Sequence, residues 1–193
     1  MPGTGNILFS GVGGQGILLA SEITAYALLE AGYDAKKSEV HGMAQRGGSV
    51  TAQLRYGDRV YSPLIEPGRA DLLVAFELME APRYLPFLHA GSRVIVNTQK
   101  ILPPSVATGL TSYPEDVLAA VRACDIQVVE IDAFALAREA GEVKAANVVM
   151  VGALSHFLPV DAAACEAIIN TRVPERFREV NLRAFAAGRA AGA

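Results

Sequence analysis

The chain has 193 residues, of which 51% are hydrophobic and 19% are charged, and its formal net charge is -3. This acidic balance argues against a nucleic-acid surface, and no run reaches the roughly 18 apolar residues that a membrane-spanning helix needs. The N-terminus lacks the basic start and apolar core of a signal peptide, and Cys124 and Cys165 lie far apart without ligand spacing. We therefore expect a soluble, cytoplasmic, globular protein with a single domain over residues 1–193.

The first part of the chain has the pattern of an α/β unit. An apolar run at 6–12 ends in glycines, and a segment of helical composition follows at 17–30, which Gly32 closes. A second extended stretch at 34–41 leads into the sequence HGMAQRGG. A buried strand, a tight glycine turn and a helix are therefore expected at the start of the fold.

The next segment predicts a hairpin. Apolar and polar residues alternate over 50–56, which is typical of a half-exposed strand. Gly57-Asp58 then favours a two-residue turn into a returning strand at 59–62. A hairpin within an alternating chain indicates a mixed sheet.

Shorter segments complete the layout. Apolar runs at 72–76, 94–97 and 126–131 predict buried parallel strands. Segments of helical composition lie at 81–88, 114–123, 133–140, 147–158, 162–170 and 174–187. Asp161 is expected to cap the helix that follows it. Together the elements predict a three-layer α/β/α fold with a mixed, mostly parallel sheet that contains one β-hairpin.

A glycine-rich turn joins the first strand to the first helix, in the sequence Gly11-Val12-Gly13-Gly14-Gln15-Gly16. Its G-x-G-x-x-G spacing lets a phosphate approach backbone N–H groups at a helix N-terminus. A dinucleotide site also needs an acid at the end of the second strand, but Glu30 and Asp34 fall at the helix end and its turn. Ile17-Leu18 replaces the Lys-Ser/Thr of a Walker loop. Three readings remain: a purely structural turn, a dinucleotide site, or a loop beside a ligand or partner carried elsewhere.

A second glycine-rich segment lies between two predicted strands, in the sequence EVHGMAQRGGS. If the strand before it is parallel to the first strand, both glycine segments emerge at the carboxyl ends of the strands, where ligands of α/β sheets collect. Its polar residues also have structural readings, since His41 could be a hydrogen-bonded core histidine and Arg46 could pair with Glu39 or Glu22. The residues that we expect on this surface are Gly11, Gly13, Gly14, Gln15, Gly16, His41, Gln45, Arg46, Gly47 and Gly48.

The segments GVGGQG, EVHGMAQRGGSV and VYSPLI, taken in order, resemble the gamma-type subunit of the 2-oxoacid:ferredoxin oxidoreductases. Similarity continues through DLLVAFE, VIVN, KAANVVMVGAL and VNLRAFAAG, so that it spans nearly the whole chain. The segments SEVHGMAQRGG and NLRAFAAGR are most similar to the beta subunit of the indolepyruvate kind.

The resemblance implies that a 2-oxoacid, CoA and two oxidised ferredoxins give an acyl-CoA, CO₂ and two reduced ferredoxins. Thiamine diphosphate and [4Fe-4S] clusters are expected in a larger alpha subunit, without which this chain is inactive. The sequence agrees, because it has no cysteine cluster and its nearest approach to a Gly-Asp-Gly motif is Gly57-Asp58-Arg59. The implied role is to complete the active-site wall or CoA channel, with Asn147 added to the cofactor-binding residues.

The resemblance leaves alternatives for the substrate and the role. Within the family, the chain could be the gamma subunit of a pyruvate, 2-oxoglutarate or branched-chain 2-oxoacid enzyme. Outside it, the glycine turn could serve a free-standing nucleotide-binding or regulatory domain, or a scaffold subunit that touches no ligand. No catalytic residue and no metal ligand is assigned.

Overall fold

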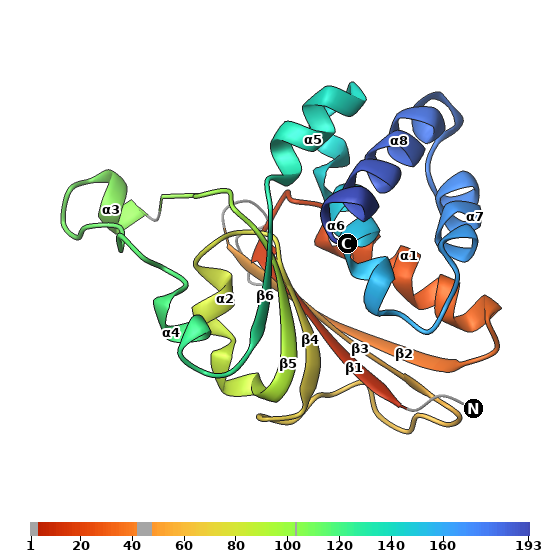
Figure 1. Cartoon of the computed structure of the whole chain (residues 1–193), viewed down its shortest axis with the longest axis horizontal. Coiled ribbons are helices and arrows are strands. Elements are labelled where there is room, and N and C mark those ends of the chain that lie inside the picture. The colour runs from red at the N-terminus through yellow and green to blue at the C-terminus, as the bar shows by residue number, and fades with distance from the viewer. Residues whose placement is uncertain (1–3, 42–47, 103) are drawn as a thin grey trace.

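The computed structural model describes residues 4–41, 48–102 and 104–193 (Figure 1). In these ranges, six strands form one sheet in the order β2-β3-β1-β4-β5-β6. The strands are β1 Gly5–Val12, β2 Asp34–His41, β3 Ser49–Gly57, β4 Ala70–Ala75, β5 Leu88–Asn97 and β6 Gln127–Ile131. The helices are α1 Ile17–Glu30, α2 Glu80–Arg83, α3 Pro104–Ala107, α4 Ala119–Arg122, α5 Ala133–Ala140, α6 Ala146–Leu154, α7 Ala162–Arg172 and α8 Glu175–Ala191. Three 3-10 turns are η1 Leu85–Phe87, η2 Val143–Ala145 and η3 Ser155–Phe157.

The sheet is mixed and mostly parallel, as predicted. Strands β1, β4, β5 and β6 pair in parallel, whereas β3 is antiparallel to both of its neighbours, β1 and β2. Five strands therefore end at one edge of the sheet, which we call the carboxyl rim: β1, β2, β4, β5 and β6. Ligands of α/β folds usually bind at such an edge.

The hairpin lies elsewhere than predicted. Residues 59–62 form no strand, and β3 pairs instead with the preceding β2, from Asp34 opposite Gly57 to His41 opposite Val50. Because β1 and β2 already flank β3, no free edge remains for a returning strand. The backbone after β3 is held by side chains, since Val60 N donates to Asp34 Oδ2 at 2.8 Å and Ile65 N donates to Gln53 Oε1 at 2.6 Å.

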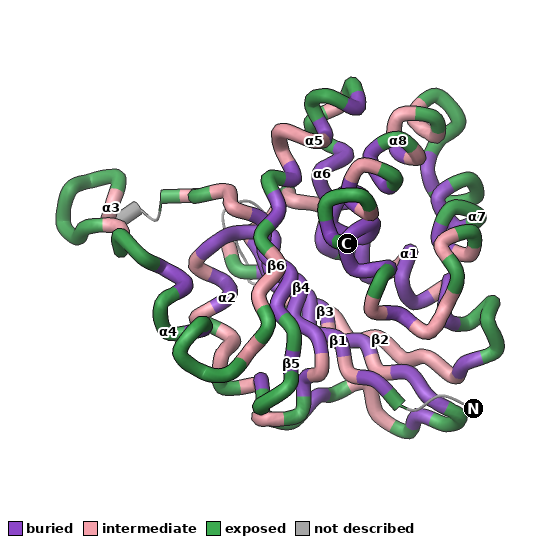
Figure 2. Tube along the Cα trace, in the orientation of Figure 1, coloured by how far each residue is buried: buried purple, intermediate pink, exposed green. Residues whose placement is uncertain are grey.

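Helices cover both faces of the sheet, so the three-layer prediction is confirmed (Figure 1). Side chains alternate along β1, where Ile7 and Phe9 pack with α1 and α5–α8 while Leu8 packs towards α2 and α4. The same alternation occurs in β4, with Val74 on one side and Leu73 on the other. Burial on both faces explains why these strands read as continuous apolar runs (Figure 2).

Two predicted helices are much shorter than their composition suggested. The segment 81–88 contains only α2 and the turn η1, and 114–123 contains only α4. In the segment 81–88, Pro82 and Pro86 supply no backbone N–H, which prevents a continuous helix there.

The predicted cap of α7 differs in detail. Asp161 precedes α7 as predicted but makes no side-chain cap bond, and Ala164 N donates to its carbonyl oxygen instead.

Candidate functional site

The two glycine-rich segments meet at the carboxyl rim. Gly13 N donates to Gly48 O at 2.9 Å, and Val12 at the end of β1 pairs with Ser49 at the start of β3. His41 ends β2 on the same rim, where its backbone pairs with Val50. The prediction that the two segments emerge side by side is therefore confirmed for their described ends.

Three glycines of the first loop are needed for different reasons. A Cβ on Gly11 would lie 2.7 Å from Gln15 Oε1, and one on Gly16 would lie 2.5 Å from Asn147 Nδ2. Gly16 also adopts φ 77 as the N-cap of α1, and Gly14 adopts φ 103. A Cβ on Gly14, in contrast, would meet none of the described residues within 4 Å. Gly14 is thus the residue at which the backbone of the loop is exposed.

Gln15 braces this loop from within. Its Oε1 accepts from Val12 N at 2.7 Å, and its Nε2 donates to Phe76 O at 2.8 Å and to Gln99 Oε1 at 2.9 Å. These partners follow or end β1, β4 and β5, so that one amide side chain ties three neighbouring strand ends together. These three hydrogen bonds therefore hold the conformation of the loop.

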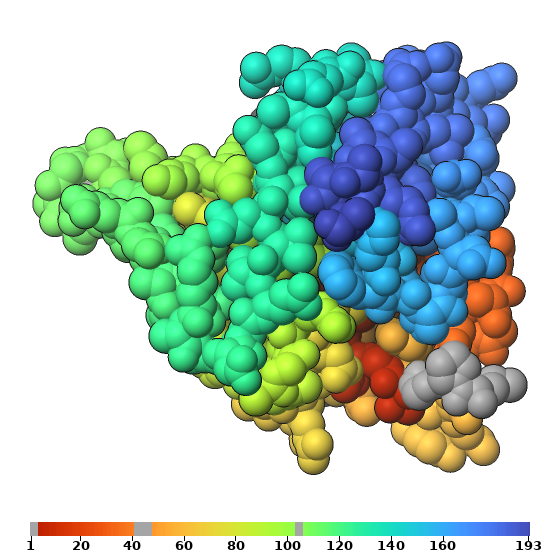
Figure 3. Space-filling view, viewed as in Figure 1, coloured from red at the N-terminus to blue at the C-terminus, as the bar shows by residue number. Residues whose placement is uncertain are grey.

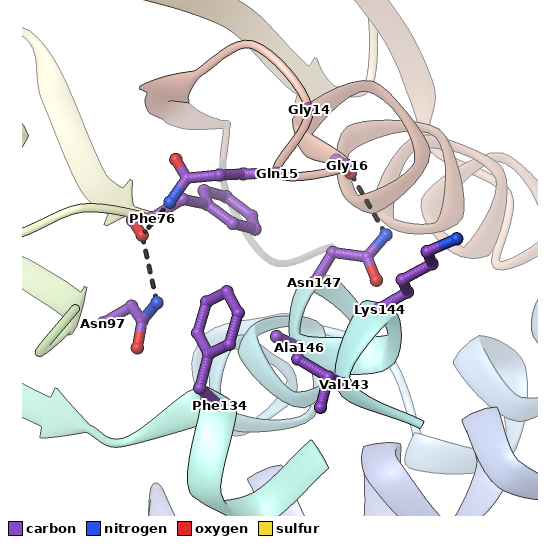
Figure 4. Close-up of a pocket in the computed structure, with 10 residues that line it drawn as sticks. All are labelled: Gly14, Gln15, Gly16, Phe76, Asn97, Phe134, Val143, Lys144, Ala146 and Asn147. Atoms are coloured by element: carbon purple, nitrogen blue, oxygen red, sulfur yellow. Dashed lines mark hydrogen bonds between the residues drawn. The ribbon is translucent and has the colours of Figure 1, made fainter. Parts of the chain in front are cut away.

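Asn147 holds the other side of the loop. It lies at the start of α6, is buried, and donates from Nδ2 to Gly16 O at 3.2 Å. Its Oδ1 accepts from the N–H of the next residue, Val148, at 3.0 Å. The bond from Asn147 to Gly16 joins the first loop to the C-terminal helices, as Figure 4 shows.

A cavity of about 230 Å³ opens between these elements (Figure 4). The rings of Phe76 and Phe134 face it, and Lys144 borders it with its ammonium group turned away from the rings. Asn97 donates to Phe76 O at 3.1 Å and accepts from Ala133 N at 3.1 Å, so its amide is engaged by the backbone. The lining residues are Gly14, Gln15, Gly16, Phe76, Asn97, Phe134, Val143, Lys144, Ala146 and Asn147.

The loop also borders a second, apolar hollow on its other side. That hollow has a volume of about 550 Å³ and shares Gly14 and Gly16 with the first cavity. Within residues 4–41, 48–102 and 104–193, no protein acceptor receives the N–H of Gly14 or of Gly16. Free donors at the N-terminus of a helix favour an anionic group such as a carboxylate or a phosphate.

Two buried carboxylates lie beneath the rim, just after β4. Glu80 is 1% exposed, accepts a short hydrogen bond from Ser10 Oγ, and pairs with Arg83 at 2.7 Å. Burial raises the pKa of Glu80, although the bonds from Ser10 and Ser49 and the charge of Arg83 oppose that shift. Glu77 is 2% exposed and accepts hydrogen bonds from Met79 N, Ile101 N and Tyr113 Oη. Both acids have structural partners inside the chain.

Part of the predicted site lies outside the described residues. Gln45, Arg46 and Gly47 belong to this part, as does the side chain of His41, and their roles stay predictions. The two acids suggested as structural partners of Arg46 both pair with Lys37, Glu22 at 3.8 Å and Glu39 more closely.

The sequence reasoning missed residues that follow β4 and β5. Phe76, Asn97 and Gln99 all contribute to the cavity or to the bracing of the loop. A signal was present, because each lies at the carboxyl end of an apolar parallel strand, where site residues collect. Phe134 carried the same signal, since it lies three residues after the end of β6, at the start of α5.

The described residues give little support to a resident metal or to thiamine diphosphate. In the ranges that the structure covers, no group of three or more His, Cys, Asp and Glu could hold a metal ion. Gly57-Asp58 lies at the opposite end of β3 from the carboxyl rim, so it does not fit a diphosphate site next to the glycine loop.

Across the described ranges, no helix is long and apolar enough to cross a membrane.

Over residues 6–191 the sequence matches the family described as pyruvate ferredoxin/flavodoxin oxidoreductase. The indolepyruvate oxidoreductase subunit IorB of Thermococcus kodakarensis is 41% identical over 188 residues, which cover 95% of this chain and 93% of that protein. The 2-oxoglutarate synthase subunit KorC of Methanothermobacter thermautotrophicus is 31% identical over 188 residues, with coverages of 95% and 92%. The gamma subunit of a keto/oxoacid ferredoxin oxidoreductase from Geobacter sulfurreducens has a TM-score of 0.73 at 27% identity, covering 97% of this chain and 98% of that chain. The chain therefore belongs to the pyruvate ferredoxin/flavodoxin oxidoreductase family.

Proposed function

We propose that this chain is the small subunit of a thiamine-diphosphate-dependent 2-oxoacid:ferredoxin oxidoreductase that acts on indolepyruvate. Its carboxyl rim completes the active-site wall or CoA channel of a larger partner subunit, and residues 1–193 act as one domain. The observation that carries the proposal is the open backbone at Gly14, which is braced by Gln15 and Asn147 and flanked by a cavity on each side.

The residues of this chain would bind and orient rather than react. Thiamine diphosphate and the iron–sulfur clusters, held by the partner, would supply the decarboxylation and the electron transfer. The N–H groups of Gly14 and Gly16, which no acceptor among the described residues receives, suit the carboxylate of a 2-oxoacid or a phosphate of CoA. Phe76 and Phe134 give the adjoining cavity apolar walls. On this proposal the chain has no turnover without its partner.

The most direct test places a small side chain at the open point of the loop. In Gly14→Ala, the added methyl group would project into space that the described residues leave empty, towards whatever the rim faces. The matched control is Gly91→Ala, because Gly91 has a similar φ of 91 and an equally open side but lies at the amino end of β5. Both substitutions carry a similar backbone strain, about 1–2 kcal/mol.

We expect Gly14→Ala to lower kcat/KM of the assembled enzyme roughly tenfold or more, while Gly91→Ala affects only stability. The measurement is the reduction of ferredoxin with indolepyruvate and CoA, together with thermal unfolding of each variant. Equal kinetics for the two variants in an intact complex would remove the glycine loop from the active-site wall.

The 31% identity to a 2-oxoglutarate synthase subunit favours a second candidate substrate. In that case the chain would be the gamma subunit of a 2-oxoglutarate enzyme with the same rim. Values of kcat/KM for indolepyruvate and 2-oxoglutarate, measured on the same assembled complex, separate the two. A preference for 2-oxoglutarate would replace the indolepyruvate assignment and leave the role of the rim unchanged.

A further inference from the structure

An arm projects from the body of the molecule between β5 and α4. It comprises residues 99–102 and 104–117, and it includes the short helix α3. Figures 1 and 3 show it extending sideways, well beyond the helices that cover the sheet. Among its described residues, Val117 joins the core and Tyr113 packs against it, while the middle of the arm stays exposed.

The arm is uncharged between its two ends. No residue between Lys100 and Glu115 carries a charge, although 19% of the whole chain is charged. Leu110 is 80% exposed and Leu102 is 54% exposed. Solvated loops usually carry charged residues, whereas the central parts of protein interfaces are depleted of them.

The root of the arm, in contrast, is fixed. The buried carboxylate of Glu77 accepts from Ile101 N and from Tyr113 Oη, each at 3.0 Å, and from Met79 N at 2.7 Å. The ammonium group of Lys100 lies 5.4 Å from the centre of the Tyr113 ring. Burial, with the neighbouring Glu77, also raises the pKa of Tyr113, so its hydroxyl stays protonated and keeps donating. Both ends of the arm are thus held by one carboxylate while the tip is exposed.

The root also connects the arm to the candidate site. Gln99 accepts from Gln15 Nε2 at 2.9 Å, and its carbonyl accepts from Leu78 N at 3.0 Å. The arm therefore leaves the carboxyl rim beside the glycine loop, which is the surface that the proposed function places against the large subunit. A pre-oriented arm loses less conformational entropy when it binds than a flexible one does.

We propose that the arm is a docking element whose uncharged part, with Leu102 near the root and Leu110 at the tip, inserts into an apolar groove of the large subunit. This inference rests on the proposed function, because it takes the occupant to be that subunit. The carboxylate of Glu77 holds the arm in the orientation in which it docks, next to the shared active site.

The test uses two pairs of substitutions that are matched in exposure. Leu110→Asp is paired with Tyr61→Asp, since Leu110 is 80% and Tyr61 81% exposed. Leu102→Asp is paired with Leu64→Asp, at 54% and 58%. Both controls lie in the segment that follows β3, at the edge of the sheet opposite the carboxyl rim. Circular dichroism and thermal unfolding of each isolated variant establish that it is folded.

The readout is the dissociation constant for the purified large subunit, measured by biolayer interferometry, with sedimentation velocity of the isolated chain. We expect each arm variant to bind roughly tenfold or more weakly, and each control to bind like the wild type. Arm variants that bind like their controls, or controls that bind as weakly as the arm variants, would overturn the inference. So would a wild-type dimer that Leu110→Asp converts to a monomer, because a second copy would then be the occupant. If the wild-type chain fails to bind the large subunit at all, the proposed function fails instead.

Discussion

The two faces of the sheet are built very differently. One face carries α1 and α5–α8, in which α6 and α8 approach so closely that a Cβ on Gly188 would overlap the carbonyl oxygen of Val149, and one on Gly152 that of Phe185. Among the described residues, the other face carries the short helices α2 and α4, the turn η1, Ile65 from the segment after β3, and the root of the arm. The first face is a layer of longer helices with a close backbone contact between α6 and α8, whereas the second is interrupted.

The two faces therefore differ in what they contribute: one stabilises the fold by close packing, and the other leaves surface for contacts. Helices with small residues at their crossing pack closely and resist change, because interiors are as dense as organic crystals. The interrupted face leaves surface and chain length for other uses, and the returning end of the arm packs there. The layer with the longest helices supports the rim from one side, while the opposite side carries the root of the arm that we propose as a docking element.

The largest expected effect comes from the helix crossing. Gly188→Ala places a methyl group against the backbone of α6, which cannot move without shifting the helix. We expect the free energy of unfolding to fall by more than about 3 kcal/mol. Chemical denaturation measures it, with Ala186→Ser as the control, because Ala186 is exposed on the same helix and its substitution should stay within about 0.5 kcal/mol. A small effect at Gly188 would mean that the crossing is loose and would weaken the contrast between the faces.

Replacing one buried leucine on each face compares how much stability the packing of each face provides. Leu28 in α1 and Leu118 just before α4 are both buried, at 0% and 2% exposure, and belong to opposite cores. We expect Leu28→Ala to cost about 3–5 kcal/mol and Leu118→Ala about 2 kcal/mol or less, because a short helix can collapse into the space left by the deletion. Denaturant titrations of both variants under the same conditions test this. A larger loss at Leu118 would reverse the comparison.

The smallest effect concerns the buried carboxyl group of Glu80, on the interrupted face. Since burial raises its pKa above the usual 4.5, the folded state holds the proton more tightly than the unfolded state. The stability that Glu80 contributes is therefore complete below pH 4.5 and is lost as the pH rises through the pKa of the folded state. Glu80→Gln cannot ionise, so wild type should lose stability relative to this variant as the pH rises towards neutrality. A pH-independent difference between the two would show that Ser10, Ser49 and Arg83 fully offset the burial.

Most elements of the fold were predictable from local pattern. The helix α1 and the strand β2 have the predicted bounds, and β4 and β6 lie close to theirs. Apolar runs, helical composition and glycine positions report backbone preferences that hold before any tertiary contact forms. The same reasoning misplaced the hairpin, because Gly57-Asp58 carries the local signature of a turn but says nothing about which sheet edges are free.

The candidate site was predictable only in part. The glycine loop and the start of α6 were expected, and the structure joins them through Asn147 and Gly16. Phe134 and the two buried acids after β4 were not expected, since their importance arises from neighbours that lie far away in sequence. The hydrogen bond from Tyr113 to Glu77 also joins residues far apart in sequence, and it holds the end of the arm that returns to the body.

The sequence by itself determined the strand and helix segments, the α/β class and the glycines that the first loop requires, because these depend on periodicity and on the φ angles that a residue can adopt. Only the tertiary structure decided which strands became neighbours, which amides turned inward to brace the loop, and which charges became buried. Those outcomes depend on competition for sheet edges and on desolvation, and neither is a property of any local segment of the chain.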